Sequence, residues 1–392
     1  MNKGCIGRVR VLLLIVAIIL CSVECTELIS VNARTRTENK STTKRRVKKK
    51  VNKVKKNVNA KSGSSDNPGS DIPVYASKLN EINLKHYKHA VQAYVVLGKY
   101  LYITQTYKKT DVKKGVLNKI GQGFKNHNVV VFSRYVLTDG TYEYESSMFL
   151  IDAGHGQTLE YIGDGYFLIE CGYYYDKATG NEWSNQIGRI KYQNDTILYN
   201  KDIKRFTYMS FMGVHLKGDV VKRVSAAVSS DGTKLIVLRR TVSNRQDYMI
   251  YSLSKVKALW NKTLGNEVSC KSGIFKDMQN TDSGFKLCKD IVKIPSSIQG
   301  IDLSDGGNGV FSLYISSGDE EVGKKLKIYR FNSNGKLKRW KYVDYTRIWN
   351  READRKVEIE GMRINGDYLQ FILKDLKTKK HVVASVLKKD LK

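Results

Sequence analysis

Five stretches of this 392-residue chain repeat one pattern, which constrains the fold more than any other feature of the sequence. Each stretch starts with a polar residue and continues as a strand rich in β-branched or aromatic residues, a turn rich in Gly, Asn or Asp, and a second strand. Neighbouring polar positions lie 61 to 74 residues apart. These leading positions are Gln92, Gln157, Ser225, Gln299 and Glu360.

A repeat of this length predicts a β-propeller. One four-stranded blade usually takes roughly 40–50 residues, and the longer period fits blades with long outer hairpins. A further strand follows the hairpin within the repeats, and five repeats fill the chain from Val91 to its end. We therefore predict an all-β, five-bladed β-propeller domain over residues 72–392. Two packed β-sandwiches and a parallel β-helix are the alternatives, and short helices are expected only at Asn80–Ala90 and Ser254–Leu264.

The N-terminus predicts export. Three basic residues in the first ten positions precede the apolar run Val11–Cys21. That run is shorter than the roughly 20 residues that span a bilayer, and the arrangement is typical of a secretory signal peptide. We expect residues 1–33 to form this peptide, with cleavage after Cys25 or Ala33, and the mature protein to be secreted. An uncleaved membrane anchor is the alternative.

A basic segment follows the predicted signal peptide. Residues 34–61 hold 13 Lys or Arg, one Glu and no aromatic residue, so this part of the chain cannot bury enough apolar surface to fold. We predict a disordered basic linker over residues 34–71. The residues expected to bind a polyanion are Lys44, Arg45, Arg46, Lys48, Lys49, Lys50, Lys53, Lys55 and Lys56.

The charge of the chain indicates its partners. The formal net charge is +30, of which +12 lies in residues 34–61, +1 in residues 1–33 and the remaining +17 in residues 62–392. Such a protein is attracted to polyanions. Because export argues against nucleic acid, we expect an anionic cell-wall polymer or the membrane surface of bacteria. A solvated spacer is the alternative for the basic run, and the cell-surface association that we propose for it would weaken at high salt.

We predict no metal and no cofactor. Neither a Cys/His cluster with zinc spacing nor a complete EF-hand loop is present. The predicted mature chain keeps Cys171, Cys270 and Cys288, an odd number that excludes a disulfide scaffold. Pairing of Cys270 with Cys288 stays open.

Side chains at the repeated positions are the candidates for a ligand site, because the innermost strands of a propeller line its central channel. Gln and Glu supply the hydrogen-bond donors and acceptors that a sugar or phosphate polymer requires. The candidates for ligand binding are His155, Gln157, Glu160, Gln92, Gln299 and Glu360. The alternative is that these side chains satisfy backbone groups between blades.

Catalysis would require two converging carboxylates. A glycoside hydrolase places them about 5 Å apart or roughly 6.5–9.5 Å apart, depending on the stereochemical outcome. The candidates are Asp152, Glu160, Glu170 and Glu360. Nothing in their spacing shows that any two converge, so no catalytic residue is assigned.

Several motifs resemble the helveticin J family, the large class III bacteriocins of lactobacilli. They are GHGQT within Met148–Gly163, WSNQIGRIKY (Trp183–Tyr192), KRVSAAVSS at the start of Lys222–Arg240, and the QG and EG pairs at Gln299 and Glu360. The motifs cover most of Val91–Lys392 in the family's order. The resemblance implies a propeller fold, secretion and antibacterial activity against related Gram-positive bacteria, and it implies no catalytic residue.

These observations lead to three hypotheses. The first is a secreted antibacterial protein that binds an anionic wall or surface glycopolymer. The second is a cell-surface adhesin or lectin that binds glycans without killing. The third is a glycan hydrolase built on a propeller.

Overall fold

The computed structural model describes residues 69–86, 89–110, 128–213, 216, 218–281, 287–288, 298–305, 310–350 and 355–392. Residues 65–392 cluster as one compact unit, to which all of these ranges belong. The predicted signal peptide and the nine predicted polyanion-binding residues lie outside the described residues. The first strand, β1, begins at Gly69, three residues before the predicted domain boundary.

Within the described ranges, most strands group into five four-stranded antiparallel units, each running from an innermost to an outermost strand. The first, fourth and fifth units are joined at their edges in one 14-stranded sheet. The first is β3 (Val91–Leu97), β4 (Tyr100–Tyr107), β5 (Val129–Thr138) and β6 (Thr141–Ile151). The second is β7 (Leu159–Tyr161), β8 (Tyr166–Cys171), β11 (Gln186–Lys191) and β13 (Lys204–Thr207). The third is β14 (Val221–Val228), β15 (Lys234–Thr241), β16 (Gln246–Ser252) and β18 (Leu287–Cys288). The fourth is β19 (Ile298–Leu303), β20 (Ser312–Asp319), β21 (Lys324–Asn332) and β22 (Leu337–Asp344). The fifth is β23 (Val357–Asn365), β24 (Tyr368–Asp375), β25 (His381–Leu387) and β2 (Ser77–Ile82).

Shorter elements decorate these units. β1 (Gly69–Tyr75), β12 (Ile197–Tyr199) and β17 (Glu267–Ser269) add parallel edge strands, and β9 (Tyr174–Asp176) pairs with β10 (Asn181–Trp183). The helices are α3 (Leu253–Lys262) and α4 (Gly273–Thr281), with 3-10 turns η3 (Asn200–Asp202), η4 (Met209–Phe211), η5 (Glu320–Val322) and η6 (Lys388–Leu391). In the part of the chain that the structure describes, no helix is long and apolar enough to cross a membrane.

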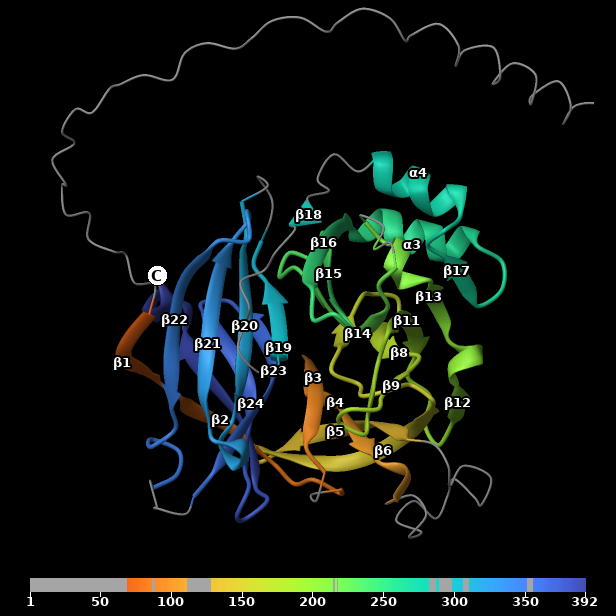
Figure 1. The fold of residues 1–392 in the computed structure, drawn as a ribbon. Helices are drawn as coiled ribbons and strands as arrows, with labels where there is room; N and C mark the ends of the chain where they lie inside the picture. Colours follow the sequence, from red (N-terminus) through yellow and green to blue (C-terminus); the bar gives the residue numbers. More distant parts are fainter. Residues whose placement is uncertain are drawn as a thin grey trace, which may run out of the picture. The chain divides into compact units, whose positions relative to one another are not determined.

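The five repeated sequence segments are the five inner hairpins, β3–β4, β7–β8, β14–β15, β19–β20 and β23–β24. Their innermost strands contact one another in a closed cycle, β3 to β7 to β14 to β19 to β23 and back to β3. Four of these strands, β3, β14, β19 and β23, are labelled near the middle of the view in Figure 1. The predicted β architecture is therefore confirmed, and its arrangement is propeller-like. The fifth unit is completed by β2, so the beginning and the end of the described chain share one sheet.

The hydrophobic core is divided in the same cyclic way. Five clusters of buried side chains each lie between two neighbouring units. Between the first and second units, for example, the ring centres of Tyr102 and Phe167 are 4.8 Å apart and those of Phe132 and Phe167 are 5.2 Å apart. Because aromatic and β-branched residues fill the space between sheets, the many Tyr residues of the sequence have a structural role here.

The helix predictions had mixed outcomes. The prediction at Ser254–Leu264 is confirmed as α3, whose first turn is capped by the Ser252 hydroxyl accepting from the Lys255 N–H. The prediction at Asn80–Ala90 is wrong, because Glu81 and Ile82 pair with β25 and with β6. Pairing with distant strands overrides local propensity in this segment. α4 was not predicted.

The described cysteines behave as core residues. Cys171 and Cys270 are free thiols, and burial raises the pKa of both. The side chain of Cys288, the other cysteine considered for pairing, lies outside the described residues. Both thiols lie in hydrophobic clusters, which suits a small apolar side chain.

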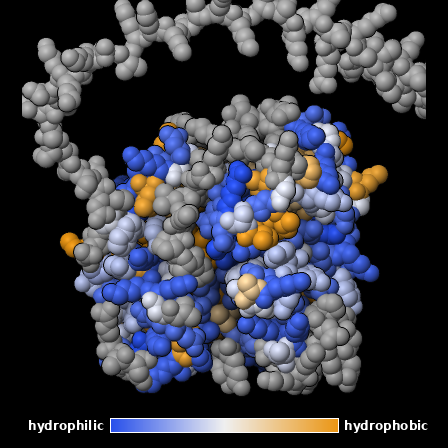
Figure 2. All heavy atoms as spheres, in the orientation of Figure 1, coloured by the Kyte–Doolittle hydropathy of each residue, from blue (hydrophilic) through white to orange (hydrophobic). Residues whose placement is uncertain are grey.

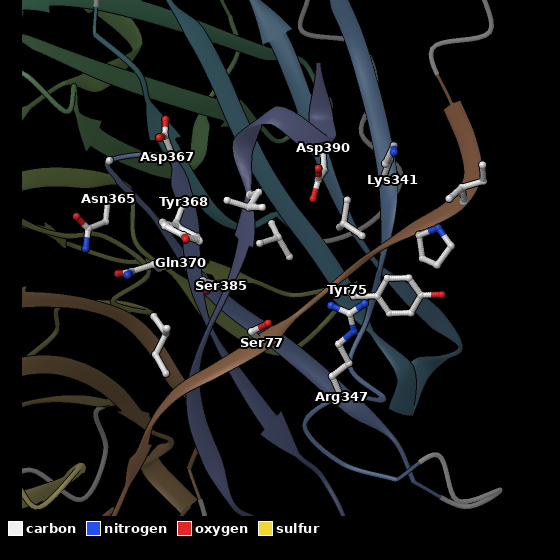
Figure 3. A pocket seen from close by; sticks show the side chains of 17 residues that line it. Tyr75, Ser77, Lys341, Arg347, Asn365, Asp367, Tyr368, Gln370, Ser385 and Asp390 are labelled. Atoms are coloured by element: carbon white, nitrogen blue, oxygen red, sulfur yellow. The ribbon is translucent and has the colours of Figure 1, made fainter.

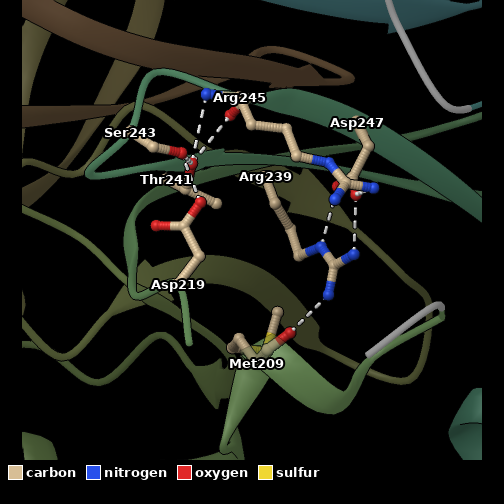
Figure 4. Close-up of polar contacts among 7 residues, drawn as sticks. All are labelled: Met209, Asp219, Arg239, Thr241, Ser243, Arg245 and Asp247. Carbon is tan, nitrogen blue, oxygen red and sulfur yellow. Dashed lines mark hydrogen bonds and ion pairs between the residues drawn. The ribbon is translucent and has the colours of Figure 1, made fainter. Parts of the chain in front are cut away.

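A buried ion pair joins β15 to β16 (Figure 4). The Arg239 guanidinium donates two hydrogen bonds of 2.8 Å to the Asp247 carboxylate and a third, of 2.9 Å, to the Met209 carbonyl. Arg239 has no exposed surface, and Asp247 is 1% exposed. Loss of Asp247 would remove the carboxylate that compensates the buried Arg239 charge, whereas Asp247 itself also lies 3.9 Å from Arg245.

We expect Asp247→Ala to lower the free energy of unfolding by about 3–5 kcal/mol, because it removes the carboxylate that compensates the buried Arg239 charge. Denaturant-induced unfolding of purified protein measures this loss. The matched control is Lys257→Ala, which breaks the exposed Lys257–Asp164 pair at 3.1 Å and should cost at most about 1 kcal/mol. Equal losses in the two variants would contradict the assignment.

Candidate functional site

The five repeated polar positions lie in, or two residues before, the innermost strands, and a hydrogen bond joins Gln157 to Gln299. Gln92 lies in β3, Gln157 two residues before β7, Ser225 in β14, Gln299 in β19 and Glu360 in β23. All five side chains are buried. We call this group the axial ring, together with three further residues that bond to it, Arg223, Glu358 and Glu170.

Hydrogen bonds link members of the axial ring across unit boundaries. The Gln157 amide donates to the Gln299 side-chain oxygen at 3.2 Å, and the Gln299 amide donates to Glu358 at 3.3 Å. Arg223 donates to the Gln157 side-chain oxygen and to the Ile298 carbonyl. The side chains predicted to bind a ligand are thus engaged with one another, and their role in ligand binding stays a prediction.

Two members of the ring were missed from the sequence. Arg223 and Glu358 each precede a repeated position by two residues, and a strand presents residues i and i+2 on one face. That alternation was the signal that could have identified them. Glu358 also lies 3.7 Å from Lys374, which partly compensates its charge.

The neighbouring carboxyl groups of Glu358 and Glu360 share a buried environment. Burial raises the pKa of Glu360 well above its usual value, and the Glu358 charge raises it further. Burial also raises the pKa of Glu358, but the nearby Lys374 charge opposes that shift, so the pair favours a proton on Glu360. One Glu360 carboxyl oxygen and the Gln92 amide oxygen are buried with no hydrogen-bond partner among the described residues.

Glu170 anchors the second unit to the third. Its carboxylate accepts from the Thr158 hydroxyl at 2.9 Å and from the Gln157 N–H at 3.1 Å. Thr158 in turn accepts from the Ala226 N–H at 2.8 Å. Glu170 therefore orients Gln157, and its bonds serve the interface between units.

A second charged layer lies near the axial ring. The Arg363 guanidinium donates to the Glu160 carboxylate and to the carbonyls of Leu159 and Tyr94. Burial raises the pKa of Glu160 to about 8 and that of Asp302 to about 6, while the nearby Arg363 charge opposes both shifts. Two carboxyl groups thus share one guanidinium in a buried site, which favours a proton on one of them.

Close backbone packing closes the centre. A Cβ atom on Gly300 would lie 2.3 Å from the Gly361 carbonyl carbon, and one on Gly361 would lie 3.0 Å from the Tyr94 ring. Gly361 also has φ near +60°, which disfavours other residues. The cavity left among these strands has a volume of about 10 Å³, close to the minimum for one water molecule. The glycines of the QG and EG pairs are therefore explained by the narrowness of the axis.

His155 belongs to a turn held between two units. Its N–H donates to the Ser184 hydroxyl at 2.7 Å, its carbonyl accepts from Thr106, and its ring centre lies 4.8 Å from that of Trp183. Burial and the nearby Arg223 charge lower the pKa of His155 to about 3. A general base near neutral pH needs a pKa close to 7, so these contacts favour a packing role for the ring.

The carboxylates considered for catalysis are mostly buried. Glu160, Glu170 and Glu360 are all buried and bonded to other groups of the chain, while Asp152 is partly exposed with a positive φ of 58°. Among the described residues, no group of three or more His, Cys, Asp or Glu converges as metal ligands do.

Comparison with known proteins supports the resemblance seen in the motifs. The family model described as Bacteriocin helveticin-J matches residues 73–374, and the predicted family resemblance is thereby confirmed. Among curated proteins, no sequence matches the chain.

Among solved structures, the chain is similar to the tail fibre of Staphylococcus aureus phage P68, with 14% identity and a TM-score of 0.50. The match covers 80% of this chain and 53% of the tail fibre chain, so it spans about half of that protein. A putative exo-β-1,3-galactanase from Bifidobacterium bifidum s17 matches with 10% identity and a TM-score of 0.37, covering 81% of this chain and 93% of the galactanase. Identities this low concern the fold alone.

We expect Gly300→Ala to lower the free energy of unfolding by about 2–3 kcal/mol, because its Cβ meets backbone atoms that cannot move aside independently. The control is Gly273→Ala, since a Cβ added at Gly273, the first residue of α4, would meet no other part of the chain within 4 Å. The control should change stability by less than about 1 kcal/mol. Thermal and denaturant unfolding measure both changes. A stability of Gly300→Ala equal to that of the natural chain would contradict the close packing of strands at the axis.

The raised pKa of Glu160 predicts a dependence on pH. Above its usual pKa of 4.5 the unfolded state loses the proton that the folded state keeps to about pH 8, so stability is lost as pH rises through that range. Glu160→Gln resembles the protonated form. The difference in the free energy of unfolding between the variant and the natural chain should therefore shift in favour of the variant by at least about 1 kcal/mol as the pH rises from 5 to 8. Parallel stability curves, measured by denaturation at each pH, would contradict this.

Proposed function

This chain belongs to the bacteriocin helveticin-J family, and on that basis we propose that it is a secreted antibacterial protein. It acts on the envelope of related Gram-positive bacteria and binds an anionic wall or surface glycopolymer. The observation that carries the proposal is the family match over residues 73–374, which covers most of the chain. The fold that supports the function is a five-bladed β-propeller, in which each four-stranded unit is one blade.

Positive charge on the described surface supports a polyanionic partner. The hairpin β21–β22 holds eight Lys or Arg and one Asp, and Lys324, Lys325, Lys336 and Lys338 are exposed. Lys327 lies 4.6 Å from the ring centre of Trp340 and 5.0 Å from that of Tyr342. Figure 2 shows a mainly hydrophilic face with small hydrophobic patches. Such a surface attracts anionic polymers more than apolar ones.

The N-terminal segments complete the proposal. Residues 1–33 direct secretion and are removed, and the basic residues of 34–61 add attraction to the same anionic envelope. Each Lys or Arg near an anionic surface contributes on the order of 1 kcal/mol at low salt. The segment and the hairpin therefore act in the same direction.

The burial of the candidate carboxylates argues against hydrolysis near the axis. Three of the four candidate carboxylates are buried and bonded within the chain, so a glycosidic bond of a bound polymer cannot reach them. An adhesin that binds without killing shares the same surfaces, and a growth assay beside a binding assay separates the two functions.

We expect the mature protein to inhibit growth of related Gram-positive bacteria in a zone assay and to sediment with their purified walls at low salt. Removal of residues 34–61 should weaken wall binding tenfold or more, because a dozen charges are lost. Sedimentation should fail at high salt, where these charges are screened. Wall binding without growth inhibition would favour the adhesin, and absence of both would contradict the proposal.

The contribution of the hairpin is tested by charge reversal. Lys336→Glu combined with Lys338→Glu should weaken wall binding at low salt. The matched control combines Lys99→Glu with Lys177→Glu, which gives the same net charge at two exposed positions outside the hairpin. Equal effects of the two pairs would show that only the total charge matters.

A further inference from the structure

A groove with a volume of about 1030 Å³ lies where the N-terminal strand pair changes sheets (Figure 3). We call residues Gly69–Ile82, which form β1 and β2, the strap. β1 pairs in parallel with β22, and the N–H of Ala76 still donates to the Asp344 carbonyl at 2.8 Å. From Ser77 onward the strap pairs with β25 instead. The strap groove follows this crossing from the fourth unit to the fifth.

Different elements supply the two sides of the strap groove. The strap, β22 and the segment after it contribute Tyr75, Lys341 and Arg347. The β23–β24 hairpin contributes Asn365, Asp367, Tyr368 and Gln370 on the other side, as Figure 3 shows. Ser77 and Ser385 lie between them, and Asp390 comes from the C-terminal turn η6.

Two tyrosines give the strap groove apolar faces. Tyr75 is 45% exposed and Tyr368 is 46% exposed, although both belong to strands. The Arg347 guanidinium lies 4.5 Å from the Tyr75 ring centre and supports that ring. A tyrosine held in this way presents a rigid flat surface and a hydroxyl group to a ligand.

The polar side chains of the strap groove keep unused hydrogen-bonding capacity. Asn365, Gln370, Asp367 and Asp390 make no side-chain hydrogen bond with any described residue. Amide groups both donate and accept, and carboxylates accept. This differs from the axial ring, where the side chains are bonded mainly to one another.

The charges in the strap groove are balanced. Lys341 and Arg347 face the carboxylates Asp367 and Asp390, so the lining has no net charge in a chain whose formal charge is +30. A polyanion is therefore attracted elsewhere on the protein. A mixture of flat rings, amides, carboxylates and hydroxyls suits a neutral or zwitterionic ligand with many hydroxyl groups.

We propose that the strap groove binds a saccharide chain. Sugar rings lie against Tyr75 and Tyr368, and their hydroxyl or acetamido groups bond to Asn365, Gln370, Asp367 and Asp390. This inference rests on the proposed function, because it assigns the sugar part of the envelope polymer to one site and leaves the anionic part to the basic segment and hairpin.

The test uses the full mature chain with defined oligosaccharides. A panel of N-acetylglucosamine, glucose and galactose tetrasaccharides is screened, and the strongest binder is titrated by calorimetry in moderate salt. Tyr368→Ala and the double variant Asn365→Ala/Gln370→Ala should each weaken binding at least tenfold. Tyr368→Phe, which keeps the ring, should retain most of it.

The matched control is Tyr173→Ala, because Tyr173 is 47% exposed and lies in the second unit, away from the strap groove. It should leave saccharide binding unchanged, and unfolding curves show that each variant is folded. No binding by any tetrasaccharide, or equal binding by the groove variants and the natural chain, would overturn the inference. If the groove variants lose saccharide binding but still bind walls and inhibit growth, the proposed function stands without the groove. If the natural chain binds the saccharide but neither binds cells nor inhibits them, the saccharide site stands and the proposed function fails.

Discussion

The close approach of five innermost strands at one axis is the constraint on which the structure depends. It leaves a volume of about 10 Å³ between β3, β7, β19 and their neighbours, and it requires glycine at Gly300 and Gly361. It also buries the polar side chains at the five repeated positions. Since buried polar groups need partners, the axial ring becomes a network within the chain.

That constraint separates the centre of the protein from its periphery. At the axis, Arg223, Gln157 and Gln299 are bonded to one another, which holds neighbouring units in register. At the periphery, the exposed lysines of β21–β22 and the polar side chains of the strap groove remain available to bind a partner. Binding chemistry therefore has more freedom at the outer edges of the sheets than at the axis.

The strap connects the fold to the proposed binding. It supplies the edge strand of the fourth unit and the fourth strand of the fifth, so the fifth unit is completed by residues from the beginning of the described chain. The same residues form one side of the strap groove. The strand pairing that completes the fifth unit therefore also forms one side of the strap groove.

The sequence by itself determined the β class, the five inner hairpins, the polar residues that lead them and the family, because alternation and glycine turns are local properties. Arg223 and Glu358 could have been predicted from the same alternation, because each lies two residues before a repeated polar position. Only the tertiary structure decided which side chains of the axial ring bond to one another, that Asn80–Ile82 is a strand, and that Tyr75, Arg347 and Tyr368 share a groove. These features depend on pairing between the two ends of the described chain, and no local pattern records which distant strand a segment will join.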